Sequence, residues 1–297
     1  MIRLDLHFEL DYLVDSPFGE FLFNVQPART AAQRVLTEQI DFAQDLPWRA
    51  ETAAAGNRVI RVRAPRGPVH LRYTASVTIE PLLTDPATLE ETPVDALPVD
   101  VLPFLMPSRY CESDRLGAWA HDQFGALPPG HGRIRAIEHW VRRHIAYVPG
   151  ASTTRTSALD TLTERVGVCR DMAHVMIALC RAMSIPARYV TGTDFGAEAV
   201  RAPDFHAYVE VFIGGRWFVF DPSGTGIPMG FVRIGTGADA AQVPFAMMFG
   251  AVRAPFAPWV RATACEGPGL ERPSAVDLAL STDLDHRAMP MIVAANG

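Results

Sequence analysis

The sequence lacks several features that would assign it to a special class of protein. It contains no run of about 18 apolar residues, so no transmembrane helix is expected. It carries a net charge of −6 without a basic cluster, so nucleic acid is not expected as a partner. There is no EF-hand-like loop or acidic cluster, and no metal or cofactor is expected. Residues 1–10 alternate between polar and apolar types, which predicts a strand and not a signal peptide, so the expected location is cytoplasmic.

Cysteine is scarce, with four residues in a chain of 297. Cys111, Cys169, Cys180 and Cys265 have neither the spacing of a zinc site nor that of a disulfide framework. Cys169 and Cys180 fall on one predicted helix about 16 Å apart along its axis, too far to form a disulfide. We interpret Cys111, Cys180 and Cys265 as packing residues and Cys169 as a free thiol.

The composition is that of an ordinary globular protein, with 48% hydrophobic and 20% charged residues, and the length allows two domains. The fold class predicted is α+β, with an antiparallel β domain over 1–95, a linker over 96–110, a catalytic core over 111–265 and a C-terminal extension over 266–297. The β domain is predicted from runs of alternating hydrophobicity, with 28–43 fitting helix and strand equally poorly and a turn expected at 65–68. Those runs cover residues 2–14, 20–25, 58–64 and 69–80.

A helix is predicted to begin at or near Cys169. Its apolar residues follow at offsets of 3, 4, 7, 8, 10, 11 and 14 from that cysteine, which is the spacing of one helical face. Pro186 ends the pattern, and Gly167 suits a sharp turn before the helix. A helix N-terminus favours an anion, so a thiolate at Cys169 is stabilised there and becomes a usable nucleophile. A second helix is expected over 131–146, and Ser113 or Asp114 is a plausible N-cap for an earlier one.

A β-hairpin is predicted over residues 204–223. Residues 204–213 alternate, which places His206, Tyr208, Glu210 and Phe212 on one face, and Gly214-Gly215 is typical of a two-residue hairpin turn. With that turn, residue 213 pairs with 216, and paired residue numbers sum to 429. His206 and Asp221 then form a diagonal pair on one face, at roughly 7–8 Å between backbones. A slip of one residue would place them on opposite faces.

Cys169, His206 and Asp221 are the three residue types that form a nucleophile, its base and the group that orients the base. A single cysteine at a helix start is usually a small buried hydrophobe, and a single strand histidine is usually structural. The three motifs together favour the catalytic interpretation. We predict that these three residues form a catalytic triad, provided that the helix docks on the hairpin.

The three segments resemble the transglutaminase-like superfamily, in its branch of bacterial cysteine-protease-like proteins with an N-terminal β domain. The resemblance covers about 134–223 and includes a lead-in helix at 156–162 and a strand at 186–192. It implies a papain-like core in which a cysteine-bearing helix packs on an antiparallel sheet. The short interval from Cys169 to His206 argues against papain itself. Transglutaminases also use an aromatic residue before the cysteine at the oxyanion, for which Trp140 and Tyr147 remain open.

The resulting hypothesis is thiol-dependent acyl transfer at an amide bond of a peptide or protein, most simply hydrolysis. Two alternatives stay open: crosslinking of amines to glutamine, and a non-catalytic binding module on the same scaffold. Asp171 and His174 are assigned mainly structural roles, and Tyr208 and Trp217 are equally compatible with the substrate cleft and with the core. The oligomeric state is not predicted.

Overall fold

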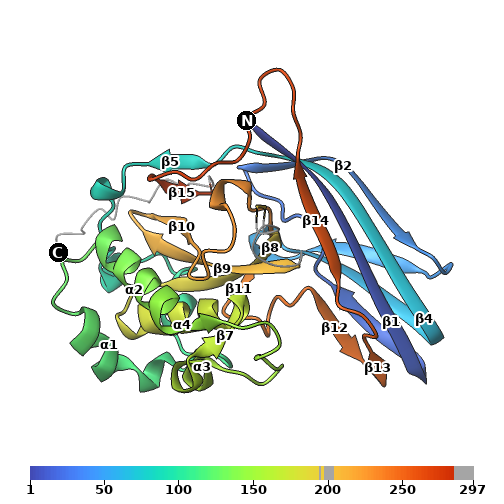
Figure 1. Ribbon diagram of the computed structural model, residues 1–297, viewed down its shortest axis with the longest axis horizontal. Coiled ribbons are helices and arrows are strands. Elements are labelled where there is room, and N and C mark those ends of the chain that lie inside the picture. The colour runs from blue at the N-terminus through green and yellow to red at the C-terminus, as the bar shows by residue number, and fades with distance from the viewer. Residues whose placement is uncertain (194, 197–203, 284–297) are drawn as a thin grey trace, which may run out of the picture.

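The computed structural model describes residues 1–193, 195–196 and 204–283. Figure 1 shows helices at one end of the molecule, a small sheet in the middle and a large sheet at the other end. The predicted α+β class is confirmed, including the cysteine-bearing helix on an antiparallel sheet. Within the described part of the chain, no helix is long and apolar enough to cross a membrane.

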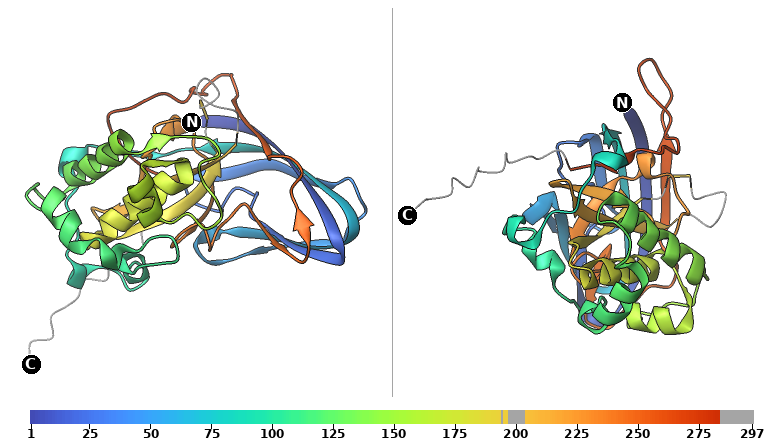
Figure 2. Two further views of the ribbon diagram at one scale, coloured as in Figure 1. Left: turned by 60° about the horizontal axis from the view of Figure 1, so that its bottom comes forward. Right: turned by 90° about the vertical axis from the view of Figure 1, so that its left-hand side faces the viewer.

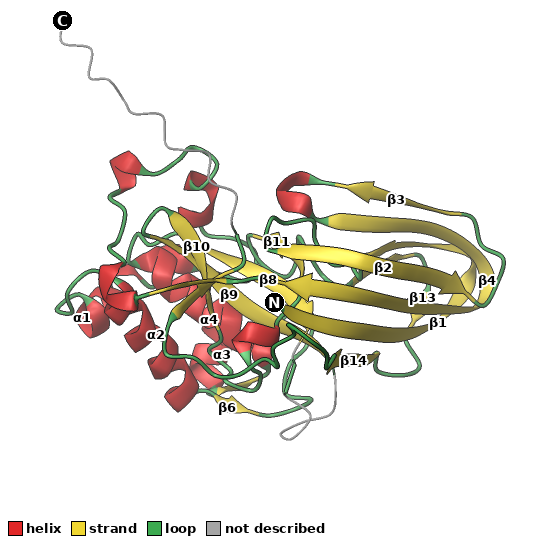
Figure 3. Cartoon of the chain, turned by 90° about the horizontal axis from the view of Figure 1, so that it is seen from above, coloured by secondary structure: helices red, strands yellow, loops and turns green. Residues whose placement is uncertain are grey.

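The large sheet has seven strands, and its central order is β12-β1-β4-β2. Two strands, β13 and β14, also pair with β1, and β3 pairs with β4 (Figure 3). One face of this sheet buries aromatic and aliphatic side chains such as Phe8, Phe21 and Tyr73. The strands are β1 (Ile2–Phe23), β2 (Gln33–Phe42), β3 (Trp48–Thr52), β4 (Arg58–Ile79), β12 (Ala246–Phe249), β13 (Val252–Arg253) and β14 (Trp259–Ala264).

The turn expected at 65–68 is wrong, because β4 runs through these residues without a break. Pro65 and Pro68 lie opposite Phe18 and Leu13 of β1, next to an irregularity between Val14 and Phe18. On the other side of β4, the strands β2 and β3 pair only with residues 71–79 and 58–62. The prolines therefore interrupt no ladder on that side, which is where a strand tolerates them. The ambiguous segment 28–43 contains β2.

Residues 246–264 belong to the large sheet. They form β12, β13 and β14, each antiparallel to β1, although the sequence analysis placed them in the catalytic core. The domain boundaries remain a prediction. The pairing shows that the chain returns to β1 after it has formed the small sheet. The chain therefore passes between the two sheets more than once.

The small sheet has the order β10-β9-β8-β11 and is antiparallel throughout. The helices lie beside it (Figure 2), and the most buried of those described, α4, packs on β8 and β9. Alternate β9 residues, Ala207, Val209 and Val211, share a hydrophobic core with α4. The small-sheet strands are β8 (Ala187–Thr193), β9 (Phe205–Ile213), β10 (Arg216–Phe220) and β11 (Arg233–Gly237), and the helices are α1 (Gly117–Phe124), α2 (His131–His144), α3 (Ala158–Glu164) and α4 (Cys169–Ala182).

Short elements connect these layers. The expected N-cap at Ser113 or Asp114 is wrong: residues 113–115 form a 3-10 turn of their own, and Leu116 is the residue that precedes α1, which starts at Gly117. Two strand pairs lie outside the main sheets, β5 (Leu82–Thr84) with β15 (Ala279–Ser281) and β6 (Ala146–Tyr147) with β7 (Val166–Gly167). The 3-10 turns are η1 (Ala54–Gly56), η2 (Pro86–Thr88), η3 (Val94–Ala96), η4 (Leu102–Leu105), η5 (Ser113–Arg115) and η7 (Pro228–Gly230).

Candidate active site

Cys169 is the first residue of α4 and is 8% exposed. The residue before it, Val168, is extended, and its N–H donates to Oδ2 of Asp171 at 2.8 Å. Asp171 is fully buried, and its Oδ1 accepts a hydrogen bond from Ser152 at 2.8 Å. A carboxylate in the first turn satisfies a backbone N–H at the helix start and complements the helix dipole. Asp171 therefore fixes the backbone at the start of α4, where Cys169 lies.

Gly167 lies where a side chain would collide with this cap. A Cβ there would be 2.8 Å from Cβ of Asp171. The same glycine pairs with Tyr147 in the parallel pair of β6 and β7, and its carbonyl accepts the N–H of Val148 at 2.9 Å. The sequence left two aromatic candidates open. Of these, Tyr147 has its backbone beside Gly167, two residues before Cys169.

Trp140, the other aromatic candidate, belongs to a different cluster. Its ring packs edge-on against Trp119 at 5.0 Å and Phe124 at 6.4 Å, between α1 and α2. The guanidinium of Arg165 covers the Trp140 ring at 5.2 Å. These contacts account for Trp140 as a packing residue.

The β9–β10 hairpin has the predicted register. Ile213 pairs with Arg216 and Val209 pairs with Phe220, so paired numbers sum to 429 as expected. Gly214 and Gly215 have φ values of 58° and 77°, the left-handed conformations that a type I′ turn requires. Nε2 of His206 lies 3.3 Å from Oδ1 of Asp221, which brings the two predicted residues together on one face.

The His206 side chain also forms a hydrogen bond with Cys169, so the structure brings all three predicted site residues together. Because Nε2 faces Asp221, Nδ1 is the ring nitrogen left to bond the thiol. Burial alone would lower the pKa of His206, but the Asp221 carboxylate and the bonds to Asp221 and Cys169 raise it to about 10. The ring of Phe231 packs on His206 at 4.9 Å between ring centres. The imidazole is therefore buried and held between both partners, which favour its charged form.

Asp221 is 3% exposed and is held by neighbours that the sequence analysis did not identify. Its Oδ1 accepts the backbone N–H of Ser223 at 3.1 Å and the Ser223 hydroxyl at 2.6 Å. Burial tends to raise the pKa of Asp221, but the His206 charge and these bonds lower it below its usual value. Ser223 lies two residues after Asp221, the position whose backbone N–H an aspartate side chain commonly accepts in a turn. That pattern was the available clue.

Two further neighbours of Asp221, Glu138 and Arg142, come from α2. Glu138 accepts the Asp221 N–H at 2.9 Å, and Arg142 donates to the Asp221 carbonyl at 2.5 Å. Glu138 is 83 residues away in sequence, so no local pattern connects it with the hairpin.

His174 is not part of this group. It is completely buried on α4, stacks on Tyr110 at 5.0 Å, and its Nε2 accepts the N–H of Ala240 at 3.2 Å. Burial lowers the pKa of His174 to about 3, so the ring is neutral. Tyr208 is buried against Phe231, and Trp217 packs against Phe212 and Phe104. His174 and Trp217 therefore pack in the interior, whereas the Tyr208 ring also stacks on His206 at 6.1 Å between ring centres.

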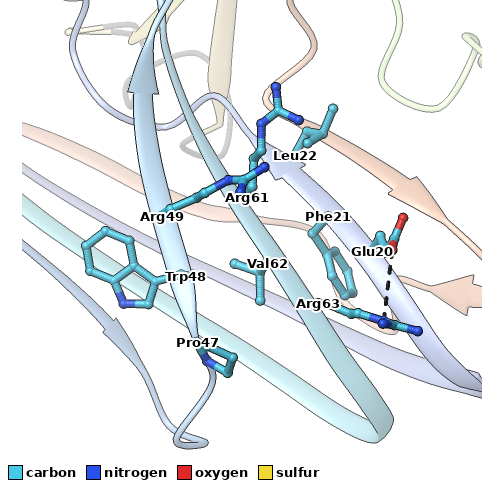
Figure 4. Close-up of a pocket in the computed structure, with 9 residues that line it drawn as sticks. All are labelled: Glu20, Phe21, Leu22, Pro47, Trp48, Arg49, Arg61, Val62 and Arg63. Carbon is cyan, nitrogen blue, oxygen red and sulfur yellow. Dashed lines mark ion pairs between the residues drawn. The ribbon is translucent and has the colours of Figure 1, made fainter.

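A surface groove lies elsewhere, on the large sheet (Figure 4). It has a volume of about 410 Å³, and its lining includes Trp48 and three arginines from β3 and β4. All three arginines pair with acidic neighbours, Arg63 with Glu20 and both Arg49 and Arg61 with Glu51. No residue of the Cys169, His206 and Asp221 group lines it. Among the described residues, no group of three His, Cys, Asp or Glu side chains could hold a metal ion.

Comparison with known proteins fits this geometry. A family model described as the transglutaminase-like superfamily matches residues 118–222, a span that includes all three site residues. A candidate cysteine protease from Cytophaga hutchinsonii has a crystal structure that is 36% identical in sequence, with a TM-score of 0.88. The match covers 94% of this chain and 97% of that one, including the large sheet. The chain belongs to the transglutaminase-like superfamily.

The match to a second relative covers a shorter part of the chain. An uncharacterised protein from Mycobacterium leprae is 32% identical over 116 residues, which is 37% of this transglutaminase-like chain. The match spans only 41% of the length of that relative. It therefore supports the family of the shared segment and says nothing of activity.

Proposed function

We propose that this transglutaminase-like protein transfers the acyl group of an amide through a thioester on Cys169. The observation that carries the proposal is the continuous contact from Cys169 through His206 to Asp221. A cysteine, a histidine and a carboxylate in this order supply the nucleophile, the proton carrier and the orienting group of thiol-dependent acyl transfer.

The reaction begins from the Cys169 thiolate paired with the His206 imidazolium. The thiolate attacks the amide carbonyl carbon, and the oxyanion forms near the N-terminus of α4, where backbone N–H groups stabilise it. His206 then protonates the leaving nitrogen as the C–N bond breaks, which leaves a thioester on Cys169 and a neutral imidazole. Water next attacks the thioester carbonyl carbon while His206 takes its proton. The C–S bond then breaks, the carboxylic acid leaves, and the thiolate–imidazolium pair is restored.

Hydrolysis of a peptide or protein is the proposed net reaction. The full-length similarity to the Cytophaga hutchinsonii protein, a candidate cysteine protease, supports water as the acyl acceptor. The triad itself accepts either water or an amine, because the chemistry at Cys169 is the same until the thioester forms.

Product mass spectrometry tests the proposal. Mixed glutamine-containing peptides are incubated with the enzyme and a labelled primary amine, with Cys169→Ala as the control. Cleavage or loss of ammonia to water that requires Cys169 supports hydrolysis. Amine incorporation that requires Cys169 would replace hydrolysis by crosslinking. Turnover by Cys169→Ala equal to wild type would refute the mechanism, and no reaction in either sample on a broad peptide set would favour a non-catalytic scaffold.

A further inference from the structure

Helix α2 contacts both backbone polar groups of Asp221. Glu138 Oε1 accepts the Asp221 N–H at 2.9 Å, and Arg142 Nη2, one helical turn later, donates to the Asp221 carbonyl at 2.5 Å. Glu138 is 1% exposed and also pairs with Arg135, on the preceding turn of α2. A buried carboxylate is costly unless it is paired, and here two arginines pair with it.

Asp221 needs such support because the sheet ends one residue before it. The pairing of β10 with β9 stops at Phe220 and Val209, so ladder bonds do not hold the Asp221 backbone. Pro222 follows and has no N–H, and Gly224 bends the chain with φ of 63°. A Cβ at Gly224 would lie 2.6 Å from the Arg142 guanidinium carbon, so this turn is shaped to admit the arginine.

We propose that Glu138 is a positioning residue that holds Asp221 in line with His206, with Arg142 as its partner in the same contact. The inference rests on the proposed function, because the position of Asp221 matters only if His206 must stay cationic beside Cys169. Glu138 bonds to the Asp221 backbone, so it acts on His206 through Asp221.

Other charged groups near Asp221 also affect its titration. On the side of β9 the neighbour is His206, which holds the Asp221 carboxylate ionised. Asp221 also lines a cavity of about 350 Å³ whose other lining residues include parts of α2, the end of β10 and residues 274–280. The titratable and charged groups lining that cavity besides Asp221 are His131, Arg135, Glu138, Arg142 and Asp277.

The test measures the thiolate and needs no substrate. The rate of Cys169 alkylation by iodoacetamide is followed from about pH 5 to 10 in the wild type, Glu138→Ala and Glu138→Gln, with adducts assigned to Cys169 by peptide mapping. In Glu138→Ala, loss of one buried hydrogen bond should lower the rate at about pH 6 roughly fivefold and shift the rise in rate to higher pH. Glu138→Gln keeps an acceptor for the Asp221 N–H and should stay within about twofold of the wild type.

Glu91→Ala is the matched control. Glu91 binds Arg133 and the Gly130 N–H at the start of the same helix, so its loss perturbs α2 but removes no contact of Asp221. The control should keep the wild-type pH profile. If Glu138→Ala does not fold, Arg142→Ala replaces it, since Arg142 is 41% exposed and its removal should produce a smaller shift in the same direction.

Two failures can be told apart. A wild type without enhanced Cys169 alkylation at low pH would refute the proposed function itself. A wild type with that enhancement, together with an unchanged profile in Glu138→Ala or in its replacement Arg142→Ala, would overturn the positioning role alone. A shift in Glu91→Ala equal to that in Glu138→Ala would also overturn it, because α2 stability would then be the cause.

Discussion

Replacing Asp221 with Asn should lower the pKa of His206 and so weaken its positive charge near neutral pH. Burial lowers the pKa of His206, but Asp221 and, to a smaller extent, Cys169 raise it from 6.5 to about 10. At about 1.36 kcal/mol per pKa unit, that difference is on the order of 5 kcal/mol in favour of the imidazolium. The neutral amide of the Asp221→Asn variant removes the larger of the two effects that oppose burial and leaves only that of Cys169, so the His206 pKa should fall well below its wild-type value.

The assay is an NMR titration of isotopically labelled histidine, combined with Cys169 alkylation at about pH 7. We expect the His206 midpoint near 10 in the wild type and at least two pH units lower in Asp221→Asn, and alkylation at least tenfold slower in the variant. Cys180→Ala is the control and should match the wild type in both. A His206 midpoint that stays within one pH unit of the wild type would refute the reasoning.

Further predictions concern stability and the start of α4. The pKa of His206 is higher in the folded than in the unfolded protein, so its charge stabilises the wild type fully below about pH 6.5. This contribution is lost as pH rises through about 10. Urea unfolding at a series of pH values should show the decline in the wild type but not in Asp221→Asn. Glu210→Ala should cost about 3 kcal/mol in the free energy of unfolding, because buried Arg188 and Arg233 lose their buried partner and keep only the more exposed Asp283, whereas Glu51→Ala, at an exposed site, should cost under about 1 kcal/mol. Gly167→Ala should displace Asp171 and slow Cys169 alkylation, while Gly132→Ala, where an added Cβ meets no atom within 4 Å, should leave the rate unchanged. Cys180→Ala should keep the chemistry and lose about 1 kcal/mol of stability by urea unfolding, since only a small buried side chain is removed.

Local patterns in the sequence were sufficient for the elements that hold the site. The apolar spacing after Cys169 predicted α4, and the Gly214-Gly215 turn predicted a register that the structure confirms. Both features depend on residues close in sequence, where periodicity and turn chemistry act directly. The catalytic role of Cys169, His206 and Asp221 stays a prediction until chemistry is measured.

Features that depend on distant residues could not be predicted in this way. Glu138 meets Asp221 only because α2 packs beside the end of β10, and residues 246–264 join β1 across most of the chain. The prediction of a turn at 65–68 was wrong for the same reason. Pro65 and Pro68 are tolerated in β4 because β2 and β3 do not pair with this part of the strand. Such outcomes are decided by tertiary contacts and not by local preference.

The most direct test of the mechanism is to trap the acyl-enzyme. Acid-quenched samples from turnover of a cleaved or deamidated peptide are measured as intact protein and then mapped by peptide mass spectrometry. The account predicts a mass increase equal to the acyl fragment, located on Cys169, present in Cys180→Ala and missing in Cys169→Ala. An acyl adduct on another residue, or undiminished turnover in Cys169→Ala, would contradict it.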